Sequence, residues 1–270
     1  MARKSGKQAR RADKYDLYQR AVQVPESDVR FLRRIFKANF GRPARSLRED
    51  FCGAAALCCA WVLDHPDNVA YGVDLDPEPI AWGRAHNLSD LPEEAQCSVR
   101  LLEGDVRTVS HPKVDITVGF NFSYFLFKER AELLRYFRKA RTTLKPEGLF
   151  AIDVFGGWEA HRTMEEETDL DDFTYCWEQA KYDPIAMELL CHIHFDFPDG
   201  SRLRKAFSYD WRLWSIPELR ELLADAGFAL SEVYWEGTCR HTGEPNDVFT
   251  KREKAQYDPA WIAYLVAVPG

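Results

Sequence analysis

The sequence predicts an α/β protein: a doubly wound parallel sheet that carries an antiparallel β insertion after its fifth strand. Strand-like and helix-like patterns alternate between residues 28 and 157, which is typical of βαβ units. Beyond Gly157, long stretches rich in aromatic and β-branched residues replace that alternation. A length of 270 residues with 46% apolar content is enough for one large domain with an insertion.

Residues 28–157 show the helix and strand patterns expected of a parallel sheet. Helical patterns are predicted at 28–41, 55–65, 77–87 and 128–144, and strands at 44–50, 69–75, 98–105, 114–120 and 148–156. Right-handed crossovers between parallel strands then place helices on both faces of the sheet.

The second half predicts antiparallel structure followed by a return to the sheet. Strands are expected at 173–183, 187–197 and 202–211, and the last two are joined by a hairpin turn at Asp199-Gly200. The simplest two-residue turn would pair Phe195 with Arg204, an awkward register for one face of a sheet. A helix over 215–228 begins at Ser215, with Glu218 at the capping-box position. Strands at 230–237 and 261–268 complete the sheet.

We therefore divide the chain into four stretches. Residues 1–27 form an N-terminal tail and an expected lid, and residues 28–157 form the ligand-binding α/β core. Residues 158–214 form the β insertion, which builds a substrate pocket or a dimer contact, and residues 215–270 return the last helix and two strands to the core.

Charge and composition exclude several classes of protein. A net charge of −7 and a pI near 5.6 disfavour a nucleic-acid partner, and the basic start MARKSGKQARR is expected to be a solvated tail. No apolar run is long enough to span a membrane, and no signal-peptide pattern is present. The seven cysteines contain no C-x-x-C pair and are expected to be reduced, mostly buried and free of metal. The sequence therefore predicts a cytoplasmic protein.

Polar residues follow four of the predicted parallel strands. They are Glu49 and Asp50 after the first, Asp74 after the second, Asp105 after the third and Asn121 after the fourth. Ligands of open α/β sheets bind at the carboxyl ends of the strands, so these residues predict one extended site. Two carboxylates and the single glycine Gly53 in the first loop favour a cationic ligand over a phosphate. S-adenosylmethionine fits, with its ammonium on Glu49 or Asp50 and its ribose on Asp74.

The segments LREDFCGAAAL, GVDLDPEPI, EGDVR and NFSY, in this order, resemble motifs I to IV of the class I S-adenosylmethionine-dependent methyltransferases. The resemblance covers residues 28–155 and the last two strands. It implies a Rossmann-like, seven-stranded sheet with a reversed terminal strand pair, S-adenosylmethionine as cofactor and S-adenosylhomocysteine as product. On the family pattern, Glu49 takes the first acidic position, Gly53 the central glycine, Asp74 the ribose site and Asp105 with Val106 the adenine site.

The first loop departs from the family pattern, because Phe51 and Ala55 replace two of its usual three glycines. Either the backbone bends less tightly than usual, or Phe51 packs beneath the loop. The residues expected to contact the cofactor are Glu49, Asp50, Phe51, Gly53, Asp74, Leu75, Asp105, Val106, Asn121, Tyr15 and Tyr18.

The acceptor side is predicted from an Asn-Tyr pair, a histidine and the aromatic residues of the second half. Asn121 and Tyr124 have the spacing of the Asn-Pro-Pro-Tyr motif of amino-group methyltransferases, although both prolines are absent; the alternative is a plain loop. His192 is a candidate general base, although an exposed hairpin face is the favoured interpretation. Tyr124, Asn121 and His192 are thus the predicted catalytic residues, and Phe122, Trp158, Tyr209 and Trp211 the predicted substrate contacts.

Tyr15 and Tyr18 precede the core, where related methyltransferases often close a lid over the cofactor; simple packing is the alternative. The function expected is methyl transfer to a nitrogen or oxygen of a small molecule, by an enzyme without a metal. A non-catalytic cofactor-binding module and a methyltransferase acting on protein or RNA remain alternatives. A homodimer through the β insertion is also expected.

Overall fold

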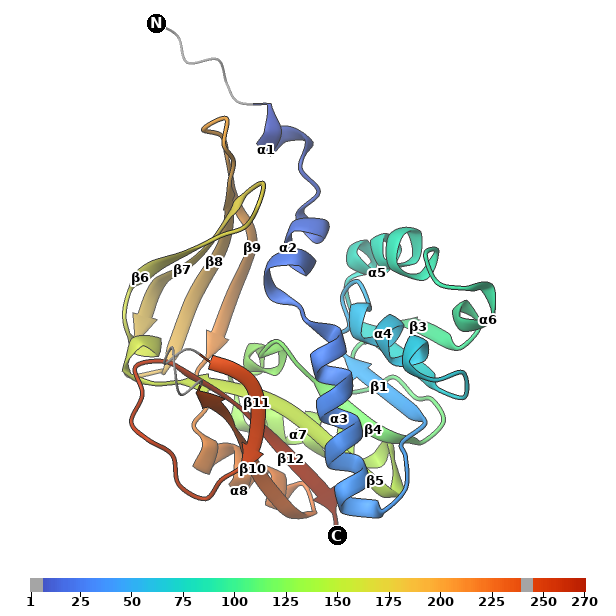
Figure 1. The fold of residues 1–270 in the computed structure, drawn as a ribbon. Coiled ribbons are helices and arrows are strands. Elements are labelled where there is room, and N and C mark those ends of the chain that lie inside the picture. The colour runs from blue at the N-terminus through green and yellow to red at the C-terminus, as the bar shows by residue number, and fades with distance from the viewer. Residues whose placement is uncertain (1–6, 239–244) are drawn as a thin grey trace, which may run out of the picture.

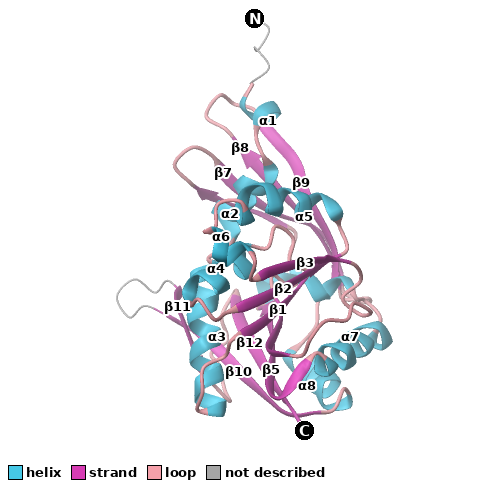
Figure 2. Ribbon diagram, turned by 90° about the vertical axis from the view of Figure 1, so that its right-hand side faces the viewer, coloured by secondary structure: helices cyan, strands magenta, loops and turns pink. Residues whose placement is uncertain are grey.

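The computed structural model describes residues 7–238 and 245–270 and contains two β-sheets (Figure 1). The main sheet has eight strands in the order β11-β10-β12-β5-β4-β1-β2-β3, and the small sheet has the order β6-β7-β8-β9. Helices cover both faces of the main sheet (Figure 2). The predicted fold class, a doubly wound α/β sheet with an antiparallel insertion, is confirmed.

The helices and helical turns are α1 (Gln8–Arg11), α2 (Lys14–Val22), α3 (Pro25–Phe40), α4 (Ala56–Asp64), α5 (Pro77–Gly83), η1 (Arg84–Leu88), α6 (Glu93–Gln96), η2 (Ser123–Leu126), α7 (Arg130–Thr142), η3 (Trp158–His161) and α8 (Ile216–Asp225). The strands of the main sheet are β1 (Ser46–Asp50), β2 (Val69–Asp74), β3 (Val99–Glu103), β4 (Val114–Gly119), β5 (Leu144–Gly156), β10 (Phe228–Thr238), β11 (Pro245–Lys251) and β12 (Trp261–Pro269). The strands of the small sheet are β6 (Met164–Asp169), β7 (Thr174–Asp183), β8 (Glu188–Asp196) and β9 (Arg202–Arg212).

The main sheet contains the seven expected strands and one more. Strands β1 to β5 pair in parallel, and β12 inserts antiparallel between β5 and β10. Strand β11 adds an antiparallel edge next to β10. The sequence did not predict β11 because PNDVFTK has only two neighbouring apolar residues and no alternation.

The small sheet has four strands where the sequence predicted three. The additional strand β6 reads MEEETD, which is too acidic to be recognised by an apolar pattern. The hairpin register also differs by one residue from a two-residue turn, because Asp196 pairs with Arg202 and Phe195 with Leu203. The turn is one residue longer, and Gly200 adopts a left-handed φ of 76° within it.

Alternation along β5 shows how the main sheet builds two cores. Phe150, Ile152 and Val154 face a cluster covered by α7 and α8, while Leu149 and Ala151 face a cluster covered by α3 and α4. A strand buried on both faces explains the continuous apolar sequence. The predicted Ser215–Glu218 capping box is present at the start of α8.

Two features bear on the predicted location and redox state. Among the residues that the structure describes, no helix has the length and apolar character needed to cross a bilayer. The six described cysteines are free thiols, and all but Cys97 are buried. Cys239 and the first six residues of the basic N-terminus lie outside the described residues.

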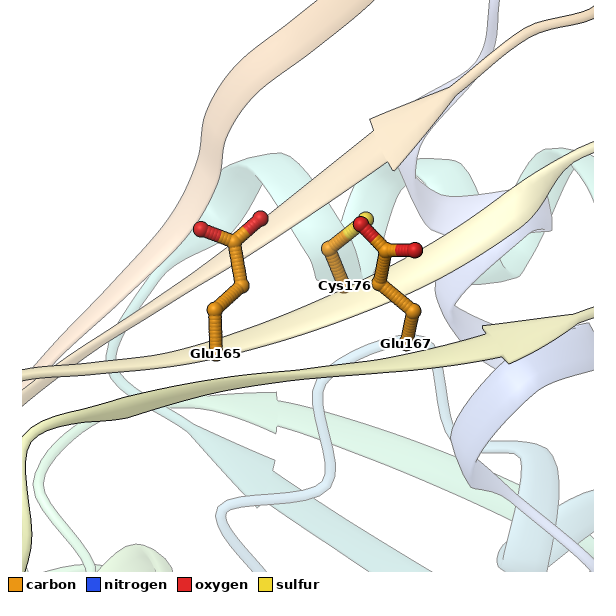
Figure 3. Close-up of side chains that lie close together, drawn as sticks. All are labelled: Glu165, Glu167 and Cys176. Carbon is orange, nitrogen blue, oxygen red and sulfur yellow. The ribbon is translucent and has the colours of Figure 1, made fainter.

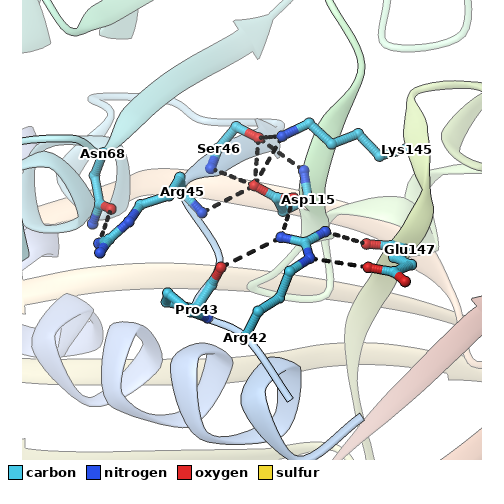
Figure 4. A network of polar contacts seen from close by, with 8 residues as sticks. All are labelled: Arg42, Pro43, Arg45, Ser46, Asn68, Asp115, Lys145 and Glu147. Carbon is cyan, nitrogen blue, oxygen red and sulfur yellow. Dashed lines mark hydrogen bonds and ion pairs between the residues drawn. The ribbon is translucent and has the colours of Figure 1, made fainter. Parts of the chain in front are cut away.

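Asp115 lies at the start of β4, at the opposite end of the parallel strands from the predicted site. Its carboxylate is the centre of a network of polar contacts (Figure 4). Its carboxylate accepts hydrogen bonds from the backbone N–H groups of Arg45 and Ser46 at 2.9 and 3.0 Å, and it pairs with Arg42 and Lys145 at 3.0 Å each. Because these donors favour the charged form, the pKa of Asp115 lies below its ordinary value despite burial. The network joins β1, β4 and β5 where they begin.

The charged end of β1 is explained by strand alternation. Arg48 and Asp50 point to one face and form a fully buried ion pair of 2.6 Å. Arg48 also donates to the carbonyls of Val106 and Val109 at 2.9 and 3.2 Å, and Tyr136 donates to Asp50 at 3.1 Å. The pair therefore fastens the end of β1 to the loop that follows β3.

We expect Asp115→Asn to lower the free energy of unfolding by about 3 kcal/mol near neutral pH, because charged and backbone donors lose their acceptor. Urea denaturation measures the difference, with Asp67→Ala, at a side chain 75% exposed, as the control. The difference should shrink as pH falls below about 4, because the folded pKa lies below the unfolded one and protonation then removes the contribution. A constant difference across that range would contradict this assignment.

The Arg48–Asp50 pair predicts a non-additive double-mutant cycle. Arg48→Met alone should cost about 3–5 kcal/mol, because it leaves a buried charge without its partner. Adding Asp50→Leu should recover part of that loss. Urea denaturation of both single variants and the double variant measures the coupling. Strictly additive effects would show that the two charges do not depend on each other.

Candidate functional site

Two adjoining cavities open at the carboxyl ends of the parallel strands. The outer cavity, of about 340 Å³, lies between the small sheet and the ends of β5 and β12. The inner cavity, of about 240 Å³, lies between the α2–α3 connection and the ends of β1, β4 and β5. Their shared wall consists of Val22, Asn121, Phe122, Glu236 and Ile262. Both cavities lie at the edge where the sequence predicted a ligand.

The inner cavity is acidic. Asp28, Glu49, Asp153 and Glu236 contribute to its lining. Burial raises the pKa of both Glu49 and Asp153 to about 8, and the nearby Asp28 adds to each increase. Glu49 accepts a hydrogen bond from the backbone N–H of Cys58 at 3.1 Å, at the start of α4. A cation bound here would compensate the carboxylates and favour their charged forms.

The wall between the cavities is a strained turn held by Asp153. Asn121 and Phe122 both adopt left-handed φ angles, of 57° and 55°. Their backbone N–H groups donate to the two Asp153 oxygens at 2.6 and 2.9 Å. Such angles are costly for residues other than glycine, so the carboxylate stabilises a turn that the chain would otherwise avoid.

The loop after β1 is tightly bent although Phe51 and Ala55 replace two of the usual glycines. Phe51, Gly53 and Ala55 have left-handed φ angles of 60°, 50° and 61°. The backbone therefore bends as tightly as a glycine-rich loop. Phe51 also packs against Tyr136 and Phe127, with ring centroids 5.4 and 5.9 Å apart. Packing beneath the loop offsets the conformational cost.

The remaining predicted cofactor residues lie along the strand edge. Asp74, at the end of β2, accepts from the N–H groups of Gly53 at 2.7 Å and Asp76 at 2.9 Å. Leu75 beside it is 69% exposed. Asp105 pairs with Arg107 at 2.6 Å, and this hydrogen-bonded partner lowers the pKa of the carboxyl group. Val106 is buried, and its carbonyl is held by Arg48.

Helix α2 bridges the small sheet and the α/β core (Figure 1). Tyr18 lines the outer cavity, and burial raises its pKa to about 12. Tyr15 packs between Trp82 of α5 and Phe207 of β9, at 5.7 and 5.9 Å, and lies outside the lining of both cavities. The helix therefore covers part of the outer cavity through Tyr18 and Val22, and its role as a lid stays a prediction.

Aromatic side chains line several sides of the outer cavity. Tyr209 and Trp211 stack at 4.5 Å, and Trp177 and Trp261 complete the lining beside them. Trp158 does not join this wall: it is 38% exposed and packs on Tyr257 at 4.9 Å. Trp158 therefore lies outside the lining of this cavity, whereas Tyr209, Trp211 and Phe122 belong to it, and their roles as substrate contacts stay predictions.

Three further predicted site residues lie elsewhere. Asp50 points away from the inner cavity into its ion pair with Arg48, which leaves Glu49 as the β1 carboxylate at the site. Tyr124 is fully buried and donates to the backbone carbonyl of Asp153 at 2.7 Å, so it is a core residue. His192 points to the outer face of the small sheet, where its Nδ1 lies 2.8 Å from Ser208 Oγ.

The outer face of the small sheet holds a separate polar cluster. Glu165, Glu167 and Cys176 lie with their ligand-type atoms within 4.8 Å of one another (Figure 3). Arg202 pairs with both Glu165 and Asp196, at 2.5 and 3.2 Å. Burial raises the pKa of the Cys176 thiol to about 12. Arg202 therefore already supplies a positive charge to this face.

Asp153, Asp28 and Glu236 are the important residues that the sequence did not predict. A lone aspartate within the apolar strand FAIDVFG was the available signal for Asp153, since a buried strand rarely carries a carboxylate without a specific role. Asp28 accepts a hydrogen bond from Tyr264 of β12 at 2.7 Å, a contact between distant segments. Glu236 gave no signal, because the face it occupies depends on the register of β10.

No family model matches the chain. YqeM of Bacillus subtilis (strain 168), a methyltransferase candidate, is 22% identical over 193 residues, which cover 68% of this chain and 75% of that protein.

Two solved structures share nearly the whole fold. An S-adenosylmethionine-dependent methyltransferase from Clostridium acetobutylicum ATCC 824 matches with a TM-score of 0.67 and 18% identity, covering 95% of this chain and 98% of that one. S-adenosylmethionine-bound CalS10, an amino pentose methyltransferase from Micromonospora echinaspora, matches with a TM-score of 0.62 and 16% identity, covering 94% and 97%. These likenesses show that the chain has the fold of S-adenosylmethionine-dependent methyltransferases.

Proposed function

We propose that the chain transfers a methyl group from S-adenosylmethionine to a nitrogen or oxygen of a small molecule. The observation that carries the proposal is the pair of cavities, one acidic and one aromatic, that share the Asn121–Phe122 turn. A cofactor in the first and an acceptor in the second would meet at that turn.

In this proposal, three carboxylates at the strand ends bind the cofactor: Glu49, Asp74 and Asp105. Glu49 accepts the ammonium group, and its buried position strengthens that ion pair. Asp74 accepts the ribose hydroxyls, since each of its oxygens keeps a lone pair beyond the N–H group it already binds. The adenine lies beside Asp105, Val106 and the exposed Leu75. S-adenosylhomocysteine occupies the same positions after transfer.

The reaction is an in-line displacement at the methyl carbon. The acceptor lone pair forms a bond to this carbon while the carbon–sulfur bond breaks, and the sulfur keeps the electron pair as neutral S-adenosylhomocysteine. The acceptor's proton leaves to solvent. The rigid Asn121–Phe122 turn aligns the acceptor with the methyl group, and helix α2 excludes water by covering the site.

A small acceptor fits the size of the outer cavity, since about 340 Å³ lies within the usual range of small-molecule sites. The likeness to CalS10, described as an amino pentose methyltransferase, supports a small acceptor that offers an amine. The homodimer contact, the absence of a nucleic-acid partner and the cytoplasmic location stay predictions.

Calorimetric titration with S-adenosylmethionine, S-adenosylhomocysteine and a nicotinamide dinucleotide tests the proposal directly. Micromolar binding of the first two alone is expected. Binding of neither would refute it, and binding without turnover on any amine, phenol, protein or RNA would favour a non-catalytic module.

Asp74→Ala should weaken S-adenosylmethionine binding more than tenfold, because the ribose loses its carboxylate acceptor. Asp67→Ala, just before the opposite end of β2, is the matched control and should bind normally. Calorimetry measures both affinities, and circular dichroism checks the fold. Unchanged affinity of Asp74→Ala would remove this residue from the site.

Binding of S-adenosylmethionine near neutral pH should release protons from the protein. Burial raises the pKa of Glu49 to about 8, so the group is mostly protonated, and an adjacent ammonium would lower that pKa. Calorimetry in buffers of different ionisation enthalpy counts the protons. Glu49→Gln should reduce the count.

Methylthioadenosine, which lacks the ammonium group, is the control ligand for this experiment. It should release fewer protons from the unaltered protein. An equal release by both ligands, or an unchanged release by Glu49→Gln, would place the ammonium away from Glu49.

A further inference from the structure

We propose that the acceptor is an amine with an apolar body that binds as its ammonium ion and loses a proton to solvent before its nitrogen lone pair attacks, and that acceptors carrying a phosphate or carboxylate are excluded. This inference rests on the proposed function, since it names the substrate class of the outer cavity. It is carried by the chemistry of the cavity's lining, taken together with the charge around its mouth.

The lining of the outer cavity is aromatic on several sides. Tyr18 comes from α2, Phe122 from the shared turn, Trp177 and Trp211 from the small sheet, and Trp261 from β12. Trp261 also packs against Trp235 at 4.7 Å, which fixes its ring. Aromatic faces attract an ammonium group through their quadrupoles, and they bind an apolar body by burial.

The charged side chains among the described lining residues of the cavity are of one sign. Glu159, Glu166 and Glu236 belong to this lining, and none of the described lining residues is a lysine, an arginine or a histidine. Glu159 pairs at 3.5 Å with Arg162, which lies outside the lining. A phosphate or carboxylate on the acceptor would therefore lose its hydration without meeting a cationic side chain among the described lining residues. An ammonium group meets both the carboxylates and the aromatic rings.

Because side chains alternate along β6, Glu166 lies on the cavity face of the small sheet, while Glu165 and Glu167 lie on the opposite face. Glu166 pairs across the sheet with Trp177 and shares its face, whereas Glu167 pairs with Cys176 on the outer face. Arg202 neutralises Glu165 on that same outer face. Glu166 is exposed at the cavity, where its field draws in a cation from solvent.

The direct test uses phenethyltrimethylammonium, a fixed cation that cannot accept a methyl group. Its binding is compared with that of phenylpropanol and hydrocinnamate, a neutral and an anionic relative of similar shape. Calorimetry in the presence of saturating S-adenosylhomocysteine should show the cation binding about tenfold more tightly than the alcohol. Hydrocinnamate should not bind, and the cation's affinity should fall as salt is added.

The matched variants are Glu166→Gln and Glu167→Gln, which remove the same charge from opposite faces of one strand. Glu166→Gln should weaken binding of the cation by about two- to fivefold, and Glu167→Gln should leave it unchanged. Trp211→Leu should weaken the cation more than it weakens the alcohol. Circular dichroism of each variant reports on the fold.

Equal binding of the cation and hydrocinnamate, or equal effects of the two glutamate variants, would overturn the inference. Binding of S-adenosylhomocysteine without binding of the cation would also overturn it, while leaving the methyltransferase proposal intact. Binding of the cation without binding of either cofactor form would support the cavity's chemistry and refute the methyltransferase proposal.

Discussion

The buried ion pair between Arg48 and Asp50 is the interaction on which the arrangement of the strand ends depends. It uses two of the three charges at the end of β1 to hold the loop after β3 through the carbonyls of Val106 and Val109. Alternation then leaves Glu49 alone on the other face, at the inner cavity. One short charged segment thus provides both the internal brace and the carboxylate of the site.

The sequence was sufficient for the parts of the fold that repeat. Alternating strands and helices predicted the main sheet, and the polar residues at strand ends predicted its functional edge. Strands β6 and β11 were missed because one is acidic and the other short of apolar residues. Asp50, Tyr124 and His192 point away from the two cavities for a different reason: the residue type was suitable for a site, but the direction of the side chain depends on register and on packing across the sheet. Neither the strand register nor the packing across the sheet can be predicted from the sequence.

Local strain is concentrated at the candidate site. Phe51, Ala55, Asn121 and Phe122 are left-handed residues without the freedom of glycine, and all lie in the two loops that border the strand ends. Each conformation costs roughly 1 kcal/mol and persists because a neighbour stabilises it. The rings of Tyr136 and Phe127 support Phe51, and Asp153 holds the Asn121–Phe122 turn. Glycine in these loops would remove the strain but also the rigidity that alignment requires.

The contacts of the N-terminal segment have a consequence for the order of folding. Gln8 bonds Asp199 across 191 residues, Arg20 reaches Asp172 across 152, and Gln19 pairs with Asn87 across 68. Contacts of such long range carry a large loop-closure entropy and cannot form until their partners are in place. Residues 8–20 can therefore dock only after the segments that they contact have folded. The small sheet must form before helix α2 can cover the outer cavity.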